Sequence, residues 1–131
     1  MDNWINQYVE IQVDKQLNAL SVKFLMFIPY QEFLKAVEHE YELIRRYNFK
    51  KCVIDLRKLP VYDKGMPEYV KDKWFPTVSS LGIQYIAFVV PEAVIGQMSM
   101  NRAHQTDETV LGMAVEHFKD FKSAEAWLQA H

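Results

Sequence analysis

The chain of 131 residues is half hydrophobic and close to charge balance, with a formal net charge of −2. This composition excludes a disordered chain and argues against a nucleic-acid-binding protein, which usually carries a basic stripe. The single cysteine, Cys52, rules out a disulfide within the chain, and neither a signal peptide nor a membrane span is visible, so we expect a cytoplasmic protein.

The first third of the chain predicts a β-hairpin followed by a helix. Residues 8–14 alternate apolar and polar side chains, and residues 19–27 form a second apolar segment after a polar turn. Pro29 ends this strand and starts a helix over residues 30–48. Its glutamates, Glu40 among them, fall mostly before its arginines, an order that the helix dipole favours. Helical spacing places on one apolar side Phe33, Val37, Tyr41 and Ile44.

The middle of the chain predicts a strand, a loop and an interrupted helix. Residues 50–56 form a short apolar strand, and residues 57–65 connect it to a helix over residues 66–81. Pro76 lies inside this helix and must kink or split it, because proline lacks the N–H group that helical hydrogen bonding needs. A glycine directly after the helix is expected to end it.

The last third predicts two further strands, each followed by a helix. Residues 83–91 are the most apolar segment, which is typical of a central strand covered on both faces. A weaker helix over residues 92–105 follows, and then a strand over residues 110–118. The closing helix covers residues 122–130, with Ser123 as its expected cap.

Together these elements predict a single α/β domain over residues 1–131. Repeated helix–strand units imply parallel strands joined by right-handed crossovers, and the leading hairpin makes the sheet mixed. We therefore expect a mixed sheet of about five strands, with about four helices packed on it.

Three stretches of the chain carry a family resemblance. They are CVIDLRKL, KWFPTVSSLGIQYIAFVVP and VEHFKDFKSAEAWLQ. In this order they resemble the third strand, the helix-to-strand passage and the ending of the STAS superfamily, and more closely of its SpoIIAA-like, Sec14-related branch. The likeness runs from Tyr8 to Leu128. It implies a SpoIIAA-like fold but little about chemistry, because a fold does not fix a function.

The best-known function of that family is a phosphorylation switch. Its loop after the third strand carries an Asp-Ser-Ser-Gly run in which one serine is phosphorylated, adding negative charge at a docking surface. The matching stretch here is VYDKG, and no serine or threonine lies between residues 22 and 76. The acceptor hydroxyl is missing, so the role of an anti-sigma factor antagonist is not carried over.

The loop after the third strand is the first candidate site. Its charged and aromatic residues gather beside the start of a helix, which can hold an anion or an acidic side chain of a partner. The structural alternative is a solvated connection, in which Asp63 caps the following helix and Arg57 pairs with a carboxylate. The residues of this candidate partner- or anion-binding loop are Asp55, Arg57, Tyr62, Asp63 and Lys64.

The helix over residues 92–105 supplies the second candidate site. Methionine adapts to irregular contacts and to lipid-like ligands, and the resemblance to Sec14 proteins, which carry lipids, implies an apolar cavity. Core packing or contact with another subunit explains the same pattern. The residues of this apolar face are Val94, Ile95, Met98 and Met100.

No catalytic set is evident in the spacing. The four histidines form no metal-ligand pair, and no glycine-rich loop is present, so we expect no metal, no cofactor and no enzymatic activity. The leading hypothesis is a non-enzymatic, regulatory STAS-like domain that binds a protein partner and forms a homodimer. The alternative is a domain that binds a small apolar, lipid-like ligand. A third hypothesis, an enzyme assembled from Asp55, Tyr62 and His117, has no support in the spacing.

Overall fold

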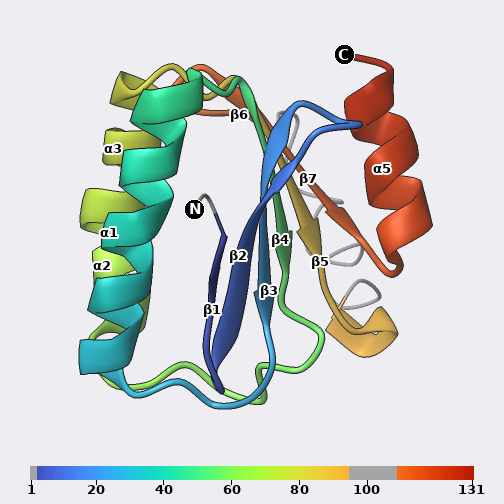
Figure 1. The fold of residues 1–131 in the computed structure, drawn as a ribbon. Helices are drawn as coiled ribbons and strands as arrows, with labels where there is room; N and C mark the ends of the chain where they lie inside the picture. Colours follow the sequence, from blue (N-terminus) through green and yellow to red (C-terminus); the bar gives the residue numbers. More distant parts are fainter. Residues whose placement is uncertain (1–2, 95–108) are drawn as a thin grey trace.

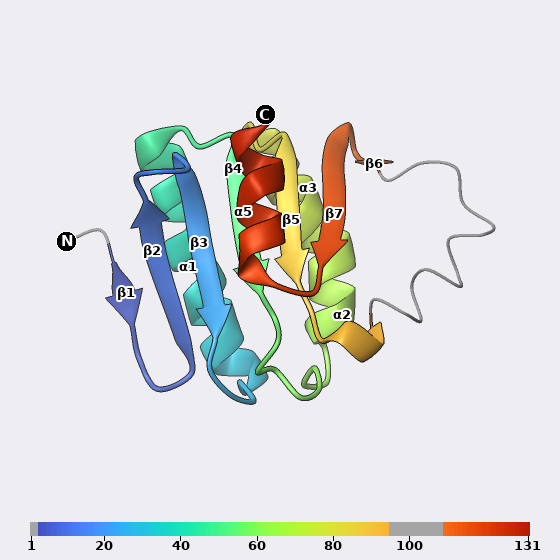
Figure 2. The same ribbon diagram turned by 90° about the vertical axis from the view of Figure 1, so that its right-hand side faces the viewer.

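A computed structural model describes residues 3–94 and 109–131. One mixed sheet runs through the molecule in the order β1-β2-β3-β4-β5-β7-β6. Helix α1 and the segment from α2 to α3 cover one face of the sheet, and α5 covers the other (Figures 1 and 2). The strands are β1 (Trp4–Ile5), β2 (Val9–Asp14), β3 (Ala19–Phe24), β4 (Lys51–Asp55), β5 (Tyr85–Val89), β6 (Thr109–Val110) and β7 (Met113–Phe118). The helices are α1 (Tyr30–Tyr47), α2 (Met66–Tyr69), the π-helical segment η1 (Val70–Trp74), α3 (Phe75–Ser80) and α5 (Phe121–Gln129).

The predicted hairpin and the parallel strands after it are confirmed. Strands β2 and β3 pair antiparallel, and β3, β4, β5 and β7 pair parallel in turn. Their register places Ile11 opposite Val22 among buried side chains, whereas Glu10 lies opposite Lys23 and both stay partly exposed. The period-two alternation read from the sequence therefore decides which face of the hairpin packs against α1.

The sheet has seven strands rather than about five. The additional strands, β1 and β6, are two residues long and lie at the two edges of the sheet. The strand expected over residues 110–118 is divided, because Leu111 and Gly112 adopt positive φ angles of 52° and 83°. Residues with these angles form the turn between β6 and β7. The predicted α/β class is therefore correct, whereas the predicted number of strands was too low.

Helix α1 buries the side that its spacing predicts. Its four expected apolar residues are buried against the sheet. The helix begins after Pro29 and ends at Asn48, whose φ of 57° and N–H bond to the Ile44 carbonyl form a left-handed cap. Glu40 is also buried, at 2% exposure, a burial that was not predicted from the sequence.

The helix over residues 66–80 accommodates Pro76 without being split. Segment η1 has the wider π-helical turn, and the N–H of Phe75 donates to the carbonyl of Val70 at its end. A π-helical turn takes up an extra residue just before the proline, where the ordinary pattern lacks a donor. Trp74 is the last residue of this segment and is buried.

Strand β5 lies between β4 and β7 in the sheet, as its apolar sequence predicts. Ala87 and Val89 pack with Ala124 and Leu128 of α5 on one face, while Ile86 belongs to the core under the other helices. Helix α5 is capped by Asp120 rather than by the expected Ser123, because the Asp120 carboxylate accepts the Ser123 N–H at 2.7 Å.

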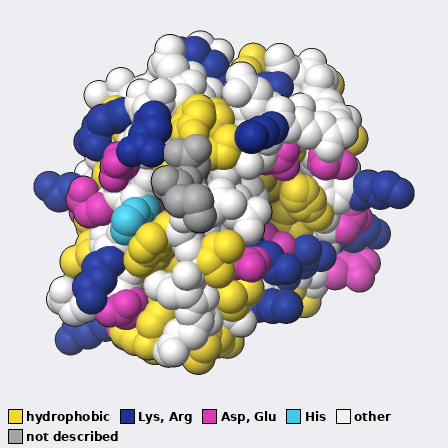
Figure 3. Space-filling view, viewed as in Figure 1, with side chains coloured by type: hydrophobic (Ala, Val, Ile, Leu, Met, Phe, Trp, Pro, Cys, Tyr) yellow, Lys and Arg dark blue, Asp and Glu magenta, His cyan; other side chains and the backbone are white. Residues whose placement is uncertain are grey.

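Residues 92–94 are helical, and the rest of the predicted helix 92–105 lies outside the described residues. Within residues 3–94 and 109–131, no helix combines the length and apolar character that a membrane crossing needs. Basic and acidic side chains are interspersed on the face shown in Figure 3, with hydrophobic side chains between them.

Candidate functional site

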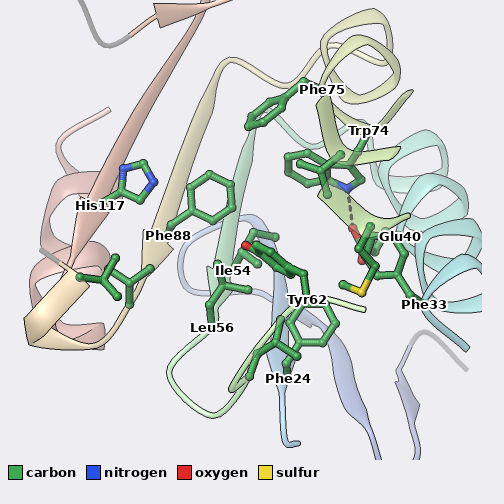
Figure 4. A pocket seen from close by; sticks show the side chains of 15 residues that line it. Phe24, Phe33, Glu40, Ile54, Leu56, Tyr62, Trp74, Phe75, Phe88 and His117 are labelled. Atoms are coloured by element: carbon green, nitrogen blue, oxygen red, sulfur yellow. Dashed lines mark hydrogen bonds between the residues drawn. The ribbon is translucent and has the colours of Figure 1, made fainter. Parts of the chain in front are cut away.

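A cavity of about 280 Å³ lies between the sheet and the helices α1 and α2–α3. Its lining is largely aromatic and aliphatic, and the side chains converge from both layers (Figure 4). The lining residues are Phe24, Phe33, Glu40, Ile54, Leu56, Leu59, Tyr62, Met66, Val70, Trp74, Phe75, Phe88, Val90, Val94 and His117.

The sheet side of the cavity is a row of residues in register. Ile54 of β4 lies opposite Phe88 of β5, and Phe88 lies opposite His117 of β7. The imidazole of His117 stacks on the Phe88 ring at a centroid distance of 5.1 Å. Phe24 extends the wall at the end of β3. All four positions lie near the carboxyl ends of parallel strands, the edge at which α/β sheets commonly bind ligands.

A cluster of three rings joins the helix side of the cavity to the sheet side. Trp74 contacts Phe75 edge-on at 5.1 Å between ring centroids. Phe88 lies 6.2 Å from the Trp74 ring and 6.3 Å from the Phe75 ring. Trp74 and Phe75 come from the helix layer and Phe88 from β5, so aromatic faces and edges line the cavity from both layers.

Glu40 is the carboxylate of this apolar cavity. It projects from α1, and its Oε1 atom accepts the Trp74 Nε1–H at 2.9 Å. Burial raises the pKa of Glu40 to about 7, against a partial lowering by that hydrogen bond. A buried ionised carboxylate is costly unless it is paired. Among the described lining residues there is no Lys or Arg to pair with it.

Tyr62 brings the loop after β4 into the cavity. Its side chain is 49% exposed, yet Figure 4 shows it lying among the other lining side chains. Burial raises the pKa of the Tyr62 hydroxyl, which agrees with a phenol end that is directed inward. Leu56 and Leu59 of the same loop also line the cavity. The loop therefore forms one wall of the site.

The charged residues of the loop do not converge with Tyr62. Asp55 accepts hydrogen bonds from Arg57, at 3.1 Å from Nε and 2.8 Å from Nη2. Burial acts to raise the pKa of Asp55, but the bonds and charge of Arg57 together outweigh it and lower the pKa. Neither residue lines the cavity, because Asp55 follows Ile54 on β4 and points to the opposite face of the sheet.

Asp63 and Lys64 lie outside the cavity as well. The Asp63 carboxylate accepts the N–H of Tyr30 at 2.7 Å and the N–H of Lys64 at 2.8 Å. Asp63 therefore caps α1. Its place in the sequence had suggested that it would cap the helix after the loop instead. Lys64 lines a separate shallow hollow with Tyr30 and Tyr69.

One residue from each predicted site lines this cavity. Val94 lines the cavity together with Tyr62, although the two are far apart in the chain. Ile95, Met98 and Met100 lie outside the described residues. Tyr62 and Val94, which were predicted as parts of two separate sites, thus line the same cavity.

Sequence reasoning missed the buried carboxylate and the ring cluster. Helical spacing did carry a signal for Glu40, since it lies three residues after Val37 and four before Ile44, on the apolar side of α1. The contact of Trp74 and Phe75 with Phe88 depends on how the chain crosses from α3 to β5, so no local sequence pattern predicts it.

The single cysteine of the chain is not an accessible nucleophile. Cys52 is fully buried, and burial, followed by the charge of Glu40, raises the pKa of its thiol well above the usual value. Such a thiol is a poor nucleophile. Within the two described ranges, no three metal-ligating side chains come together.

Comparison of the chain with protein-family models, with curated proteins and with solved structures finds no match in any of the three. The resemblance to STAS domains therefore stays a prediction, and the functional argument depends on the geometry of the cavity.

Proposed function

We propose that this protein binds a small apolar molecule in the cavity between α1, α2–α3 and the sheet. The observation that supports the proposal is a cavity of about 280 Å³ whose lining is almost wholly apolar and aromatic. Small-molecule sites are typically apolar clefts of this kind with a few placed polar groups. Here those groups are Glu40, Tyr62 and His117.

The cavity volume limits the size of the ligand. Liquid water occupies roughly 30 Å³ per molecule, so 280 Å³ has room for a ligand of about nine non-hydrogen atoms. This is near the lower end of small-molecule sites, which start at roughly 300 Å³. A short aliphatic or single-ring compound fits, whereas a whole phospholipid does not.

The proposal is tested by calorimetric titration with a series of linear alcohols from butanol to decanol. Each added methylene that is buried contributes about 0.8 kcal/mol, so affinity rises roughly fourfold per step. The rise ends near octanol, where the cavity is full. Native mass spectrometry of freshly purified protein gives an independent check for a co-purified ligand.

A matched pair of variants ties binding to the cavity. Val70→Phe adds volume at a lining position of η1, whereas Val61→Phe makes the same change on a side chain that is 63% exposed. We expect the first variant to abolish alcohol binding and the second to retain it. Saturable binding that is equal in both variants would place the site elsewhere, and an absence of binding to the parent protein would refute the proposed function.

A second candidate function, contact with a protein partner, is favoured by exposed apolar side chains in the loop after β4 and in the turn between β6 and β7. Val61, Tyr62 and Leu111 are 63%, 49% and 61% exposed. Tyr62 and Leu111 share a shallow surface hollow with residues of α2–α3. Grouped exposed hydrophobic residues often mark interaction sites. The STAS resemblance supports the same regulatory, non-enzymatic role, with a homodimer as the simplest partner.

Substitution of the exposed side chains of Val61 and Leu111 tests this candidate function without disturbing the core. Val61→Ser and Leu111→Ser remove apolar surface outside the core, whereas changing Asp63 would also remove the cap of α1. Sedimentation of the parent protein and the double variant at matched concentrations measures self-association. A dimer that dissociates only in the variant supports the contact, and a monomer in both removes the homodimer from consideration.

A further inference from the structure

The cavity combines an acidic group with rings in a way that goes beyond general apolar binding. Glu40 is 2% exposed and lines the cavity, and one of its carboxylate oxygens accepts a hydrogen bond from the Trp74 indole N–H. No Lys or Arg occurs among the described residues that line the cavity. A buried carboxylate that has a hydrogen-bond donor but no cation is suited to a positively charged ligand group.

The rings beside Glu40 are suited to the same chemistry. Trp74, which donates to the carboxylate, belongs to the cluster with Phe75 and Phe88, and the ring centroids lie 5.1 to 6.3 Å apart. Aromatic faces attract an organic cation within roughly 6 Å of the ring centre, and tryptophan does so best. Figure 4 shows Glu40 beside Trp74, with Phe75 and Phe88 further across the same cavity, so a cation at the carboxylate lies next to Trp74 and the other two rings line the space beyond it.

We propose that the ligand of this cavity is a small apolar amine, whose ammonium group binds the Glu40 carboxylate beside Trp74 while its hydrocarbon part fills the space toward Ile54 and Phe88. This inference rests on the proposed function, because it names the ligand class of the same cavity. No covalent step is involved.

The site should prefer an amine over an alcohol because the carboxylate is already desolvated before the ligand binds. Folding already buries Glu40, so the cost of removing it from water is incurred before any ligand arrives. An incoming ammonium group loses its own hydration but gains a charge-assisted hydrogen bond in a medium of low polarity. An alcohol of the same length gains only a weaker hydrogen bond, so the site should discriminate between the two.

Ionisation of Glu40 then controls affinity. The titratable groups that interact electrostatically with it are Cys52 of β4 and the neighbouring Tyr41 of α1, and Tyr62 and His117 line the same cavity further from it. Burial raises the pKa of both Cys52 and Tyr41, so these two groups stay neutral over the useful range. Protonation of Glu40 removes the negative charge that attracts an ammonium ligand, so amine affinity should fall as the pH drops below about 7.

The experiment compares hexylamine with hexanol by calorimetry on the full chain. At about pH 8.5 the alkylamine is still cationic, as a lysine side chain would be, and Glu40 is ionised. We expect the amine to bind roughly ten- to a hundredfold more tightly than the alcohol. At about pH 5.5 the carboxyl is mostly protonated, and this preference should largely disappear.

Glu40→Gln is the matched variant, because its amide oxygen can still accept the Trp74 N–H. It should lose the preference for hexylamine over hexanol, and the measured quantity is the ratio of the two affinities in the variant against the same ratio in the parent. The pH comparison on the unaltered protein keeps the test valid if the variant fails to fold.

The failure of this inference differs from the failure of the proposed function. Equal binding of amine and alcohol at about pH 8.5, or an amine preference that survives in Glu40→Gln, overturns the assignment of the amine but leaves an apolar site. Binding of neither ligand overturns both proposals.

Discussion

Replacing Glu40 with glutamine should change how the stability of the protein depends on pH. Burial raises the pKa of Glu40 from its ordinary value of 4.5 to about 7. Above pH 4.5 the unfolded chain releases this proton, whereas the folded chain retains it up to about pH 7. The folded state therefore binds more protons in this window, and the free energy of unfolding falls as the pH rises through it. The glutamine side chain of the variant does not titrate, so the variant lacks this loss.

The magnitude follows from the size of the pKa shift. One unit corresponds to about 1.4 kcal/mol, so a rise from 4.5 to about 7 corresponds to about 3 kcal/mol. The exposure of Glu40 is only 2%, so solvent screening does not reduce this value much. A loss of about 3 kcal/mol is large for a domain whose total stability is typically about 5–15 kcal/mol.

Urea unfolding followed by tryptophan fluorescence at about pH 4.5 and about pH 8 measures the effect. The amide of the variant has its own burial cost, which shifts its stability equally at both pH values. The informative quantity is therefore the change in the difference between the two proteins, expected to be about 3 kcal/mol in favour of the variant at the higher pH. A difference that stays constant with pH would refute the reasoning, because Glu40 would then titrate alike in the folded and unfolded chains.

Three further predictions concern the elements that hold the site. Asp63→Ala should cost about 1 kcal/mol in urea unfolding by removing the cap of α1, and Asp63→Asn should cost less. Gly112→Ala, with open space around its φ of 83°, should cost about 1 kcal/mol; Gly65→Ala should cost more, because its Cβ would lie 3.3 Å from a ring of α1. Arg57→Met should cost roughly 1–3 kcal/mol at neutral pH.

The Arg57 prediction has a defined sign with pH. The lowered pKa of Asp55 contributes stability above its unfolded value of 3.8, and this contribution is lost as the pH falls through the folded value. Arg57→Met removes the guanidinium but keeps the N–H of residue 57 and the charge of Lys23, which also lower the pKa of Asp55. The acid-side loss should therefore become smaller in the variant, which acid titration of unfolding in the two proteins would show; equal costs of the substitution at neutral and acid pH would contradict it.

Much of the fold could be predicted because it depends on local patterns. The alternation in residues 9–14, the helical spacing in residues 30–47 and the apolar run in residues 85–89 each specify an element and its buried face. The edge strands were missed because two-residue strands have no periodicity to detect. The division of the last strand depended on a left-handed turn at Leu111, a residue type that rarely adopts one.

The candidate site was harder to predict because its parts come from separate elements. Charge and turn residues drew attention to the loop after β4, but Asp63 and Arg57 act there as a cap and an ion-pair partner. Tyr62 was identified for its place in that loop, whereas its contribution to the cavity depends on what the sheet and the helices set opposite it.

The sequence by itself determined the strand and helix segments and the faces that they bury, because these follow from side-chain spacing along the backbone. Only the tertiary structure decided that Glu40 is buried against Trp74 and that the rings of α3 and β5 meet beside it. The reason is physical: the cost of burying a charge and the room left for a ligand depend on what packs against a residue from distant parts of the chain.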